Sequence, residues 1–138
     1  MNQEIKQWLD MANMDIGVAK HLMQNYYPKP LEIICYHCQQ AAEKSIKALV
    51  IFYGTQGGLP KLHDLSFLLN QLKNTIKIEE KYYDYADVLT PYGVSVRYPN
   101  EMFLEEHHAN TAIQYTNEIM QWVYSIVSNV ENQLILKT

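Results

Sequence analysis

The chain contains a single arginine, Arg97, which lies in the segment VSVRYPNE at positions 94–101. Its planar guanidinium can hold a carboxylate or a phosphate in two places, which the ammonium group of lysine cannot do. Tyr98 and Pro99 follow, so a ring suited to stacking and a stiffened backbone lie beside it. Three interpretations remain open: a ligand-binding arginine, an ion pair that fixes the segment, or a surface residue without a role. The candidate carboxylate partners for the ion pair are Glu43, Asp64 and Asp87.

His63 is the second residue that could do chemistry, because it stands directly before a predicted helix in which Asp64 occupies the N-cap position. The positive end of the helix dipole disfavours imidazolium there, so we expect a neutral imidazole near pH 7. A neutral imidazole can accept a proton in a reaction, or it can close the loop by an ordinary hydrogen bond. Both alternatives stay open.

Glu43 and Lys47 are four residues apart in the segment EKSIK, in the order that favours an ion pair on a helix. Such a pair is worth a few tenths of a kcal/mol on a solvated surface. The simplest interpretation is therefore a solvated pair, and the alternative is that both residues belong to a functional pattern.

Two short motifs resemble metal or redox sites but lack the geometry that such sites need. Cys35 and Cys38 fall on the apolar face of a predicted helix, with no second pair of ligands, so we expect two small buried core residues. His107 and His108 are neighbours on a helix and point about 100° apart, so they cannot converge on one ion. We expect solvated histidines and predict neither a metal nor another cofactor.

The composition indicates one globular domain, residues 1–138, with 48% apolar residues and only five glycines and five prolines. The net charge of −4 gives no overall field for nucleic acid, so any such site must be local. No targeting segment is visible, and no apolar run approaches the roughly 18 residues that span a bilayer. We therefore expect a cytoplasmic protein that does not bind membranes.

Apolar residues recur at helical spacing along most of the chain, and the fold class they predict is all-α. The expected architecture is an antiparallel up-and-down bundle of four long helices plus one short helix. Residues 91–100 are either a kinked extension of the fourth helix or irregular, and we expect the chain to fray from about residue 132. The helices are predicted over residues 2–25 and 31–53, in a short segment near 64–72, from near 78 to 89, and over 109–130.

Four stretches, in this order and spacing, resemble the HEPN domain family over nearly the whole chain. They are WLDMANMDIGVAKHLM in the first helix, CYHCQQAAEKSIKALVIFYG in the second, HDL at 63–65 and VRYPN at 96–100. The resemblance implies a helical bundle that is usually dimeric. Many members are encoded beside a small nucleotidyltransferase and act with it in toxin–antitoxin pairs, some are metal-independent ribonucleases, and others bind nucleotides or serve as assembly modules.

Two functions follow from this resemblance. The first is a non-catalytic module that forms a homodimer, acts with a nucleotidyltransferase and holds a nucleotide or RNA phosphate. The second is a ribonuclease toxin that uses Arg97 and His63. The ribonuclease members carry an arginine followed after four to six residues by a histidine, whereas nine residues separate Arg97 from His107, which favours the first function. We expect Arg97 and His63 to converge near one groove. The candidate ligand-binding residues are Arg97, Tyr98, His63, Asp64, Glu43 and Lys47.

Overall fold

The computed structural model describes residues 2–54, 63–95 and 103–137, and side chains up to residue 129 with the exception of residue 95. Within these ranges every regular element is a helix, which confirms the predicted all-α fold class. The helices are α1 (Gln3–Asn25), α2 (Leu31–Tyr53), α3 (Leu65–Asn70), α4 (Glu80–Leu89), α5 (Tyr92–Ser95) and α6 (Glu106–Lys137).

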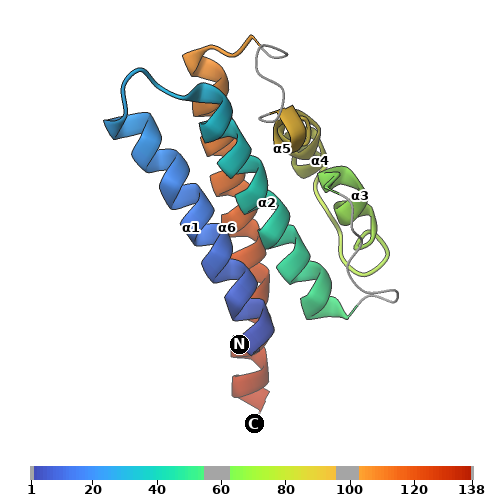
Figure 1. Ribbon diagram of the computed structural model, residues 1–138. Helices are drawn as coiled ribbons and strands as arrows, with labels where there is room; N and C mark the ends of the chain where they lie inside the picture. The colour runs from blue at the N-terminus through green and yellow to red at the C-terminus, as the bar shows by residue number, and fades with distance from the viewer. Residues whose placement is uncertain (1, 55–62, 96–102, 138) are drawn as a thin grey trace.

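The three long helices form one side of the bundle, and the short helices form the other. α1 runs antiparallel to α2 and α6, while α3, α4 and α5 lie on the side of α2 away from α1 (Figure 1). The N-terminus and the C-terminus lie at the same end of the bundle (Figure 1). α2 is thus the central helix, because it packs against α1, α6, α5 and α3.

The core follows the periodicity of the sequence. On α2 the buried face includes several small side chains, among them Ala41, Ala42 and Ser45, which allow α1 and α6 to pack closely against it. Cys35 and Cys38 are both fully buried, as expected. Burial raises the pKa of each thiol to about 12, so neither is a reactive thiolate at neutral pH.

The helix boundaries have local causes. Asn2 caps α1 by accepting hydrogen bonds from the amides of Glu4 (2.7 Å) and Ile5 (3.3 Å). Gly54 ends α2 in the left-handed conformation, with φ of 62°. Asp64 caps α3 as predicted, since its Oδ1 accepts from the amide of Phe67 at 3.2 Å.

One alternative left open by the sequence is decided, and one boundary differs from that expected. α4 ends at Leu89, as predicted, and after Pro91 the chain continues as the single turn α5, so residues 92–95 are a kinked extension. α6 remains helical through Lys137, beyond the point near residue 132 where we expected it to fray. Its last residues, ENQLILK, contain neither glycine nor proline, so nothing in the sequence stops the helix there.

Candidate functional site

Glu43 lies at the centre of a polar cluster inside the bundle, although its side chain is only 4% exposed. Gln39, Glu43 and Lys47 lie four residues apart along α2 and therefore share one stripe of the helix. Gln39 Nε2 donates to Glu43 Oε1 at 3.1 Å, and Lys47 Nζ donates to Glu43 Oε2 at 3.0 Å. The predicted pair of Glu43 and Lys47 is thus present, but it is buried rather than solvated.

The partners of Glu43 keep its carboxylate charged. Burial on its own raises the pKa of Glu43, but hydrogen bonds from Lys47, Gln39 and His63, together with the charge of Lys47, outweigh burial and leave the pKa below its ordinary value. A buried carboxylate with three donors is an anion fixed in position, able to orient whatever donates to it.

Lys47 is enclosed between two groups. Its ammonium group lies 5.7 Å from the centre of the Trp8 ring on α1, while it donates to Glu43 on its other side. The Lys47 side chain is 12% exposed. In this arrangement Lys47 neutralises the buried carboxylate and links α1 to α2.

His63 is the exposed member of the cluster. Its Nδ1 lies 2.8 Å from Glu43 Oε1, yet its side chain is 55% exposed. A carboxylate acceptor at Nδ1 favours the tautomer that carries the hydrogen on Nδ1. The lone pair of Nε2 is then available to a proton donor in solution. This arrangement of a buried carboxylate and a partly exposed imidazole can orient a general base, or it can hold a phosphate when the imidazole is protonated.

Gln39 connects this pair to α5 and was missed in the sequence. Its Nε2 also donates to the carbonyl oxygen of His63 at 3.2 Å, and its Oε1 accepts from Gln40 Nε2 at 2.8 Å. The side chain packs so closely on Gly93 that a Cβ at position 93 would lie 2.7 Å from Gln39 Cδ. One signal was available, since a glutamine one turn before Glu43 on a buried helix face needs partners.

Arg97 and Tyr98 lie outside the described residues, so the expected pairing of Arg97 with Glu43 or Asp64 is outside them as well. Before this gap the described chain ends at Ser95, the last residue of α5. α5 packs on α2 beside Gln39. Asp64 accepts from the amide of Phe67, as described above, and is engaged as a helix cap rather than with His63.

A second polar cluster joins α1 to α2 and was not foreseen. Asp15 is 9% exposed, and its Oδ1 lies 2.9 Å from His37 Nδ1. Its Oδ2 accepts from Lys44 Nζ. The side chains of His37 and Lys44 are 26% and 18% exposed, so the whole cluster lies just below the surface. It therefore acts as a polar clamp between the two helices.

Of the two neighbouring histidines on α6, His107 agrees with the expectation of a solvated side chain, whereas His108 is half-buried. His107 Nδ1 lies 3.4 Å from Glu105 Oε2, and the His107 side chain is 68% exposed. His108 Nδ1 accepts from the amide of Glu105 at 2.9 Å. Across residues 2–54, 63–95 and 103–129 no three histidine, cysteine or acidic side chains are grouped so as to hold a metal ion.

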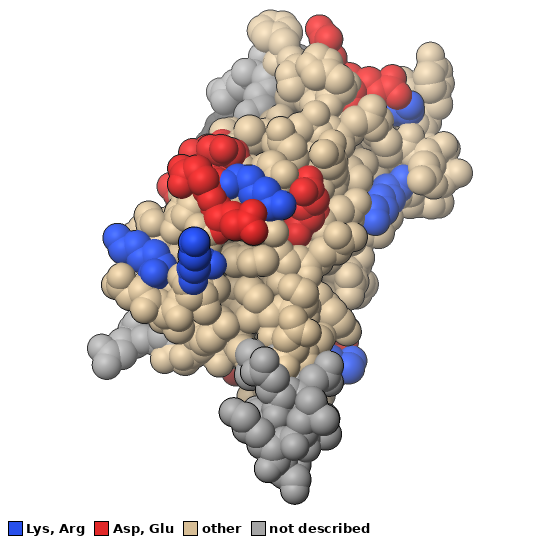
Figure 2. All heavy atoms as spheres, turned by 180° about the vertical axis from the view of Figure 1, so that it is seen from behind, with Lys and Arg blue, Asp and Glu red and all other residues tan. Residues whose placement is uncertain are grey.

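The surface shows mixed charge rather than a basic field. On the face seen in Figure 2, acidic and lysine side chains occur together in small groups, separated by uncharged surface. Lys81, for example, lies 3.9 Å from both Glu79 and Glu118. Any contact with a polyanion must therefore depend on a few residues. In the part of the chain with described structure, no helix is both long and apolar enough for a membrane span.

Comparison with known proteins gives a family and a fold. The family model described as "HEPN domain" matches residues 5–128. A protein from Methanocaldococcus jannaschii with the name "Putative toxin MJ1304" is 31% identical over 121 residues, which cover 82% of this chain and 74% of that protein.

Solved structures with the same fold come from bacteria and archaea. TT1696 from Thermus thermophilus superimposes with a TM-score of 0.74 at 25% identity, covering 91% of this chain and 98% of that chain. ST0689, an archaeal HEPN homologue, gives a TM-score of 0.68 at 24% identity and covers 92% and 99%. The HEPN domain protein tm0613 from Thermotoga maritima gives 0.67 at 21% identity and covers 88% and 98%.

Proposed function

The chain belongs to the HEPN domain family, and from this membership and the Glu43–His63 pair we propose that it is a phosphate-binding module of a toxin–antitoxin-type pair. The ligand is a nucleotide or the phosphate backbone of RNA. The module forms a homodimer in the cytoplasm and acts with a small nucleotidyltransferase. The similarity to a protein named as a toxin supports the toxin–antitoxin context.

The observation that carries the proposal is the partly exposed imidazole of His63 on a buried, charged carboxylate. Glu43 Oε1 lies 2.8 Å from His63 Nδ1 and fixes the orientation of the ring, so an incoming phosphate meets an imidazole that is already oriented. Lys47 balances the charge of Glu43 from inside the bundle. Glu43 and Lys47 accordingly hold His63 in place without contacting the ligand, and His63 is the residue that contacts it.

Arg97 supplies the second contact in this proposal. α5 packs beside Gln39, whose side chain also holds the backbone of His63, and Arg97 follows α5 by two residues. That short distance along the chain supports a position for Arg97 near His63. Arg97 then grips the phosphate with two donors, Tyr98 stacks on an adjacent base or sugar, and Asp64 fixes the start of α3.

Fluorescence anisotropy with a labelled single-stranded RNA, and with a labelled adenine nucleotide, tests the proposal. We expect Arg97→Ala to abolish binding and Arg97→Lys to restore little, because lysine lacks the bidentate fork. His63→Ala should weaken binding about tenfold, as expected for one charge-assisted hydrogen bond. His107→Ala, which removes a solvated imidazole elsewhere, is the matched control.

Helix content and thermal stability of each variant separate a ligand contact from a structural role. We expect Arg97→Ala to keep the far-ultraviolet spectrum and the mass of the wild type. If Arg97→Ala unfolds the protein, or if its affinity for RNA and nucleotide equals that of the wild type, Arg97 is a structural clamp or a bystander and the proposal is wrong.

A second candidate function is RNA cleavage, and the 2.8 Å contact between Glu43 and His63 favours it. In that reaction His63 Nε2 accepts the proton of the ribose 2′-hydroxyl as its oxygen bonds to phosphorus, and Arg97 stabilises the charge on the phosphorus oxygens. The bond from phosphorus to the 5′ oxygen then breaks, and the imidazolium returns the proton to that leaving oxygen. Under the first proposal the purified protein binds RNA and leaves it intact. Turnover that disappears in both Arg97→Ala and His63→Ala would establish the ribonuclease instead.

A further inference from the structure

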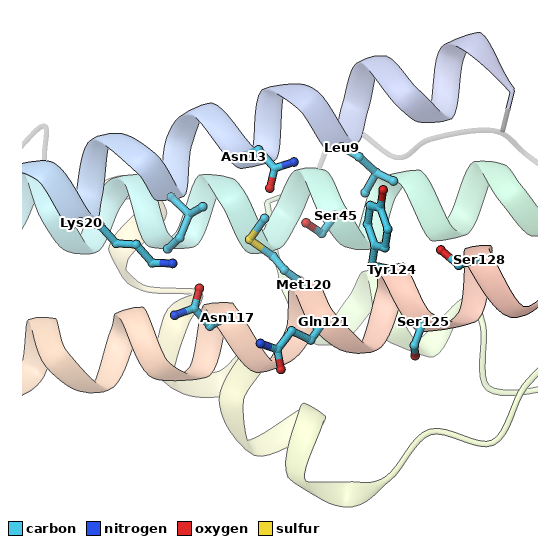
Figure 3. Close-up of a pocket in the computed structure, with 11 residues that line it drawn as sticks. Leu9, Asn13, Lys20, Ser45, Asn117, Met120, Gln121, Tyr124, Ser125 and Ser128 are labelled. Carbon is cyan, nitrogen blue, oxygen red and sulfur yellow. The ribbon is translucent and has the colours of Figure 1, made fainter.

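A groove runs along the bundle between α1 and α6, and none of its lining residues belongs to α3, α4 or α5. Its volume is about 530 Å³, which is in the range of small-molecule sites. The two helices contact each other much less extensively than each contacts α2, so the groove opens between them with Ser45 of α2 at its floor (Figure 3). It is about 16 Å long, judged from the eleven helical steps between Leu9 and Lys20.

The groove has chemically different ends. Lys20 of α1 and Asn117 of α6 face each other at one end, and Leu9 and Tyr124 lie together toward the other (Figure 3). Met120 lies between these ends, close to Ser45. The groove therefore offers hydrogen-bond donors at one end and an apolar and aromatic surface at the other.

The charge of the groove is positive. Lys20 is the charged residue of the lining, which includes no acidic residue. Within the described part of the chain Lys20 makes no ion pair, in contrast to Lys44 and Lys47, which are both engaged with buried carboxylates. An anionic group of a ligand would meet Lys20 without displacing a protein carboxylate, with the side-chain amide of Asn117 beside it.

The other end fits an aromatic body. The Tyr124 side chain is half exposed and offers its ring across the groove from Leu9 (Figure 3). Rings pack well against a tyrosine face and against a methionine thioether, and Met120 provides the latter. Seven helical steps separate Asn117 from Tyr124, which puts these two residues about 10 Å apart along α6.

We propose that this groove is a second ligand site, separate from the His63 site, which binds a small aromatic anion with its charged group at Lys20 and Asn117 and its ring at Leu9, Met120 and Tyr124. The groove is formed wholly by α1, α2 and α6, and none of its lining residues belongs to the Glu43 or Asp15 cluster. The two sites can therefore be tested independently.

The test uses two fluorescent probes that differ by one charged group. Anilinonaphthalene sulfonate is an aromatic anion, and phenylnaphthylamine is the same ring system without the sulfonate. We expect one anionic probe to bind per chain. Lys20→Met should weaken the anionic probe about tenfold, the value of a hydrogen bond to a charged group, and leave the neutral probe within about twofold. Asn13→Glu, which puts a carboxylate on the rim, should act in the same direction.

Matched variants and a site-specific readout complete the design. Lys20→Arg keeps the charge and should keep binding, while Lys73→Met removes an exposed lysine outside the groove and should change neither probe. In a two-dimensional amide spectrum the anionic probe should shift the side-chain amides of Asn117 and Gln121, which line the groove, and leave those of Asn70 and Asn74 in place.

Three results would overturn the proposal. Lys20→Met could weaken both probes equally, Lys73→Met could act as strongly as Lys20→Met, or the shifted amides could lie outside the groove. The proposal would also be overturned if the full-length protein bound no anionic probe because the groove is covered in its native oligomer.

Discussion

At the scale of single residues, Glu43 decides how the polar cluster behaves. It is the shared acceptor for Gln39, Lys47 and His63, and its burial makes those hydrogen bonds matter more than they would on the surface. Removing it leaves Lys47 charged, nearly buried and without its partner.

We expect Glu43→Ala to lower the free energy of unfolding by about 3–5 kcal/mol, the usual cost of breaking a buried ion pair from one side. Urea denaturation monitored by circular dichroism measures this. Glu105→Ala, which removes an exposed carboxylate, is the control and should stay within about 0.5 kcal/mol of the wild type. Equal stability of Glu43→Ala and the wild type would show that the cluster is not a structural unit.

The same residue predicts a pH dependence. The folded-state pKa of Glu43 is lowered, so its contribution to stability is present above its unfolded pKa and is lost as the pH falls through the folded value, below the ordinary 4.5. The difference in unfolding free energy between the wild type and Glu43→Gln should therefore be large at neutral pH and shrink at acidic pH. A difference that is constant between neutral and acidic pH would contradict this assignment.

At the scale of elements, the contact between α5 and α2 depends on a glycine, which has no side chain to hold the two helices apart. Gly93 lets α5 lie on Gln39, and Gln39 in turn holds the backbone of His63. The position of α5 is therefore linked to the candidate site through one side chain, that of Gln39.

We expect Gly93→Ala to destabilise the protein by about 1–3 kcal/mol, because its Cβ would collide with Gln39. It should also weaken ligand binding at His63. Gly17→Ala is the matched control: Gly17 lies inside α1 with no atom within 4 Å of an added Cβ, so alanine there should raise stability by about 0.5–1 kcal/mol. Thermal melts of both variants give the comparison, and a stabilised Gly93→Ala would show that α5 can move away without cost.

At the scale of the whole molecule, the surface bears on assembly. Several large apolar side chains are exposed, among them Met14 at 72% and Phe103 at 92%. Met11 and Val18 lie on the same stripe of α1 as Met14, at helical spacing. An exposed apolar stripe on a three-helix layer is consistent with the homodimer of our proposal.

We expect light scattering to give twice the chain mass of 16.1 kDa at tens of micromolar protein. Far-ultraviolet circular dichroism should show helix alone among regular structures. A monomer mass at that concentration would refute the dimer and leave the fold unaffected.

The sequence by itself determined the elements of this protein. Helical spacing and the cap at Asp64 depend on interactions within one or two turns, so both could be predicted without knowing the fold. The pairing of Glu43 with Lys47 was predictable for the same reason.

Only the tertiary structure decided which side chains from different elements meet. Asp15 and His37 are 22 residues apart in sequence, and Glu43 and His63 are 20 apart, so no local sequence pattern predicts either contact. The burial of the Glu43–Lys47 pair, the closeness of Gly93 to Gln39 and the groove between α1 and α6 likewise depend on how α2 is enclosed by its neighbours. Periodicity fixes which face of each helix is buried, but packing fixes which residues on two buried faces lie opposite each other, and that choice depends on the shapes of all the side chains in the core together.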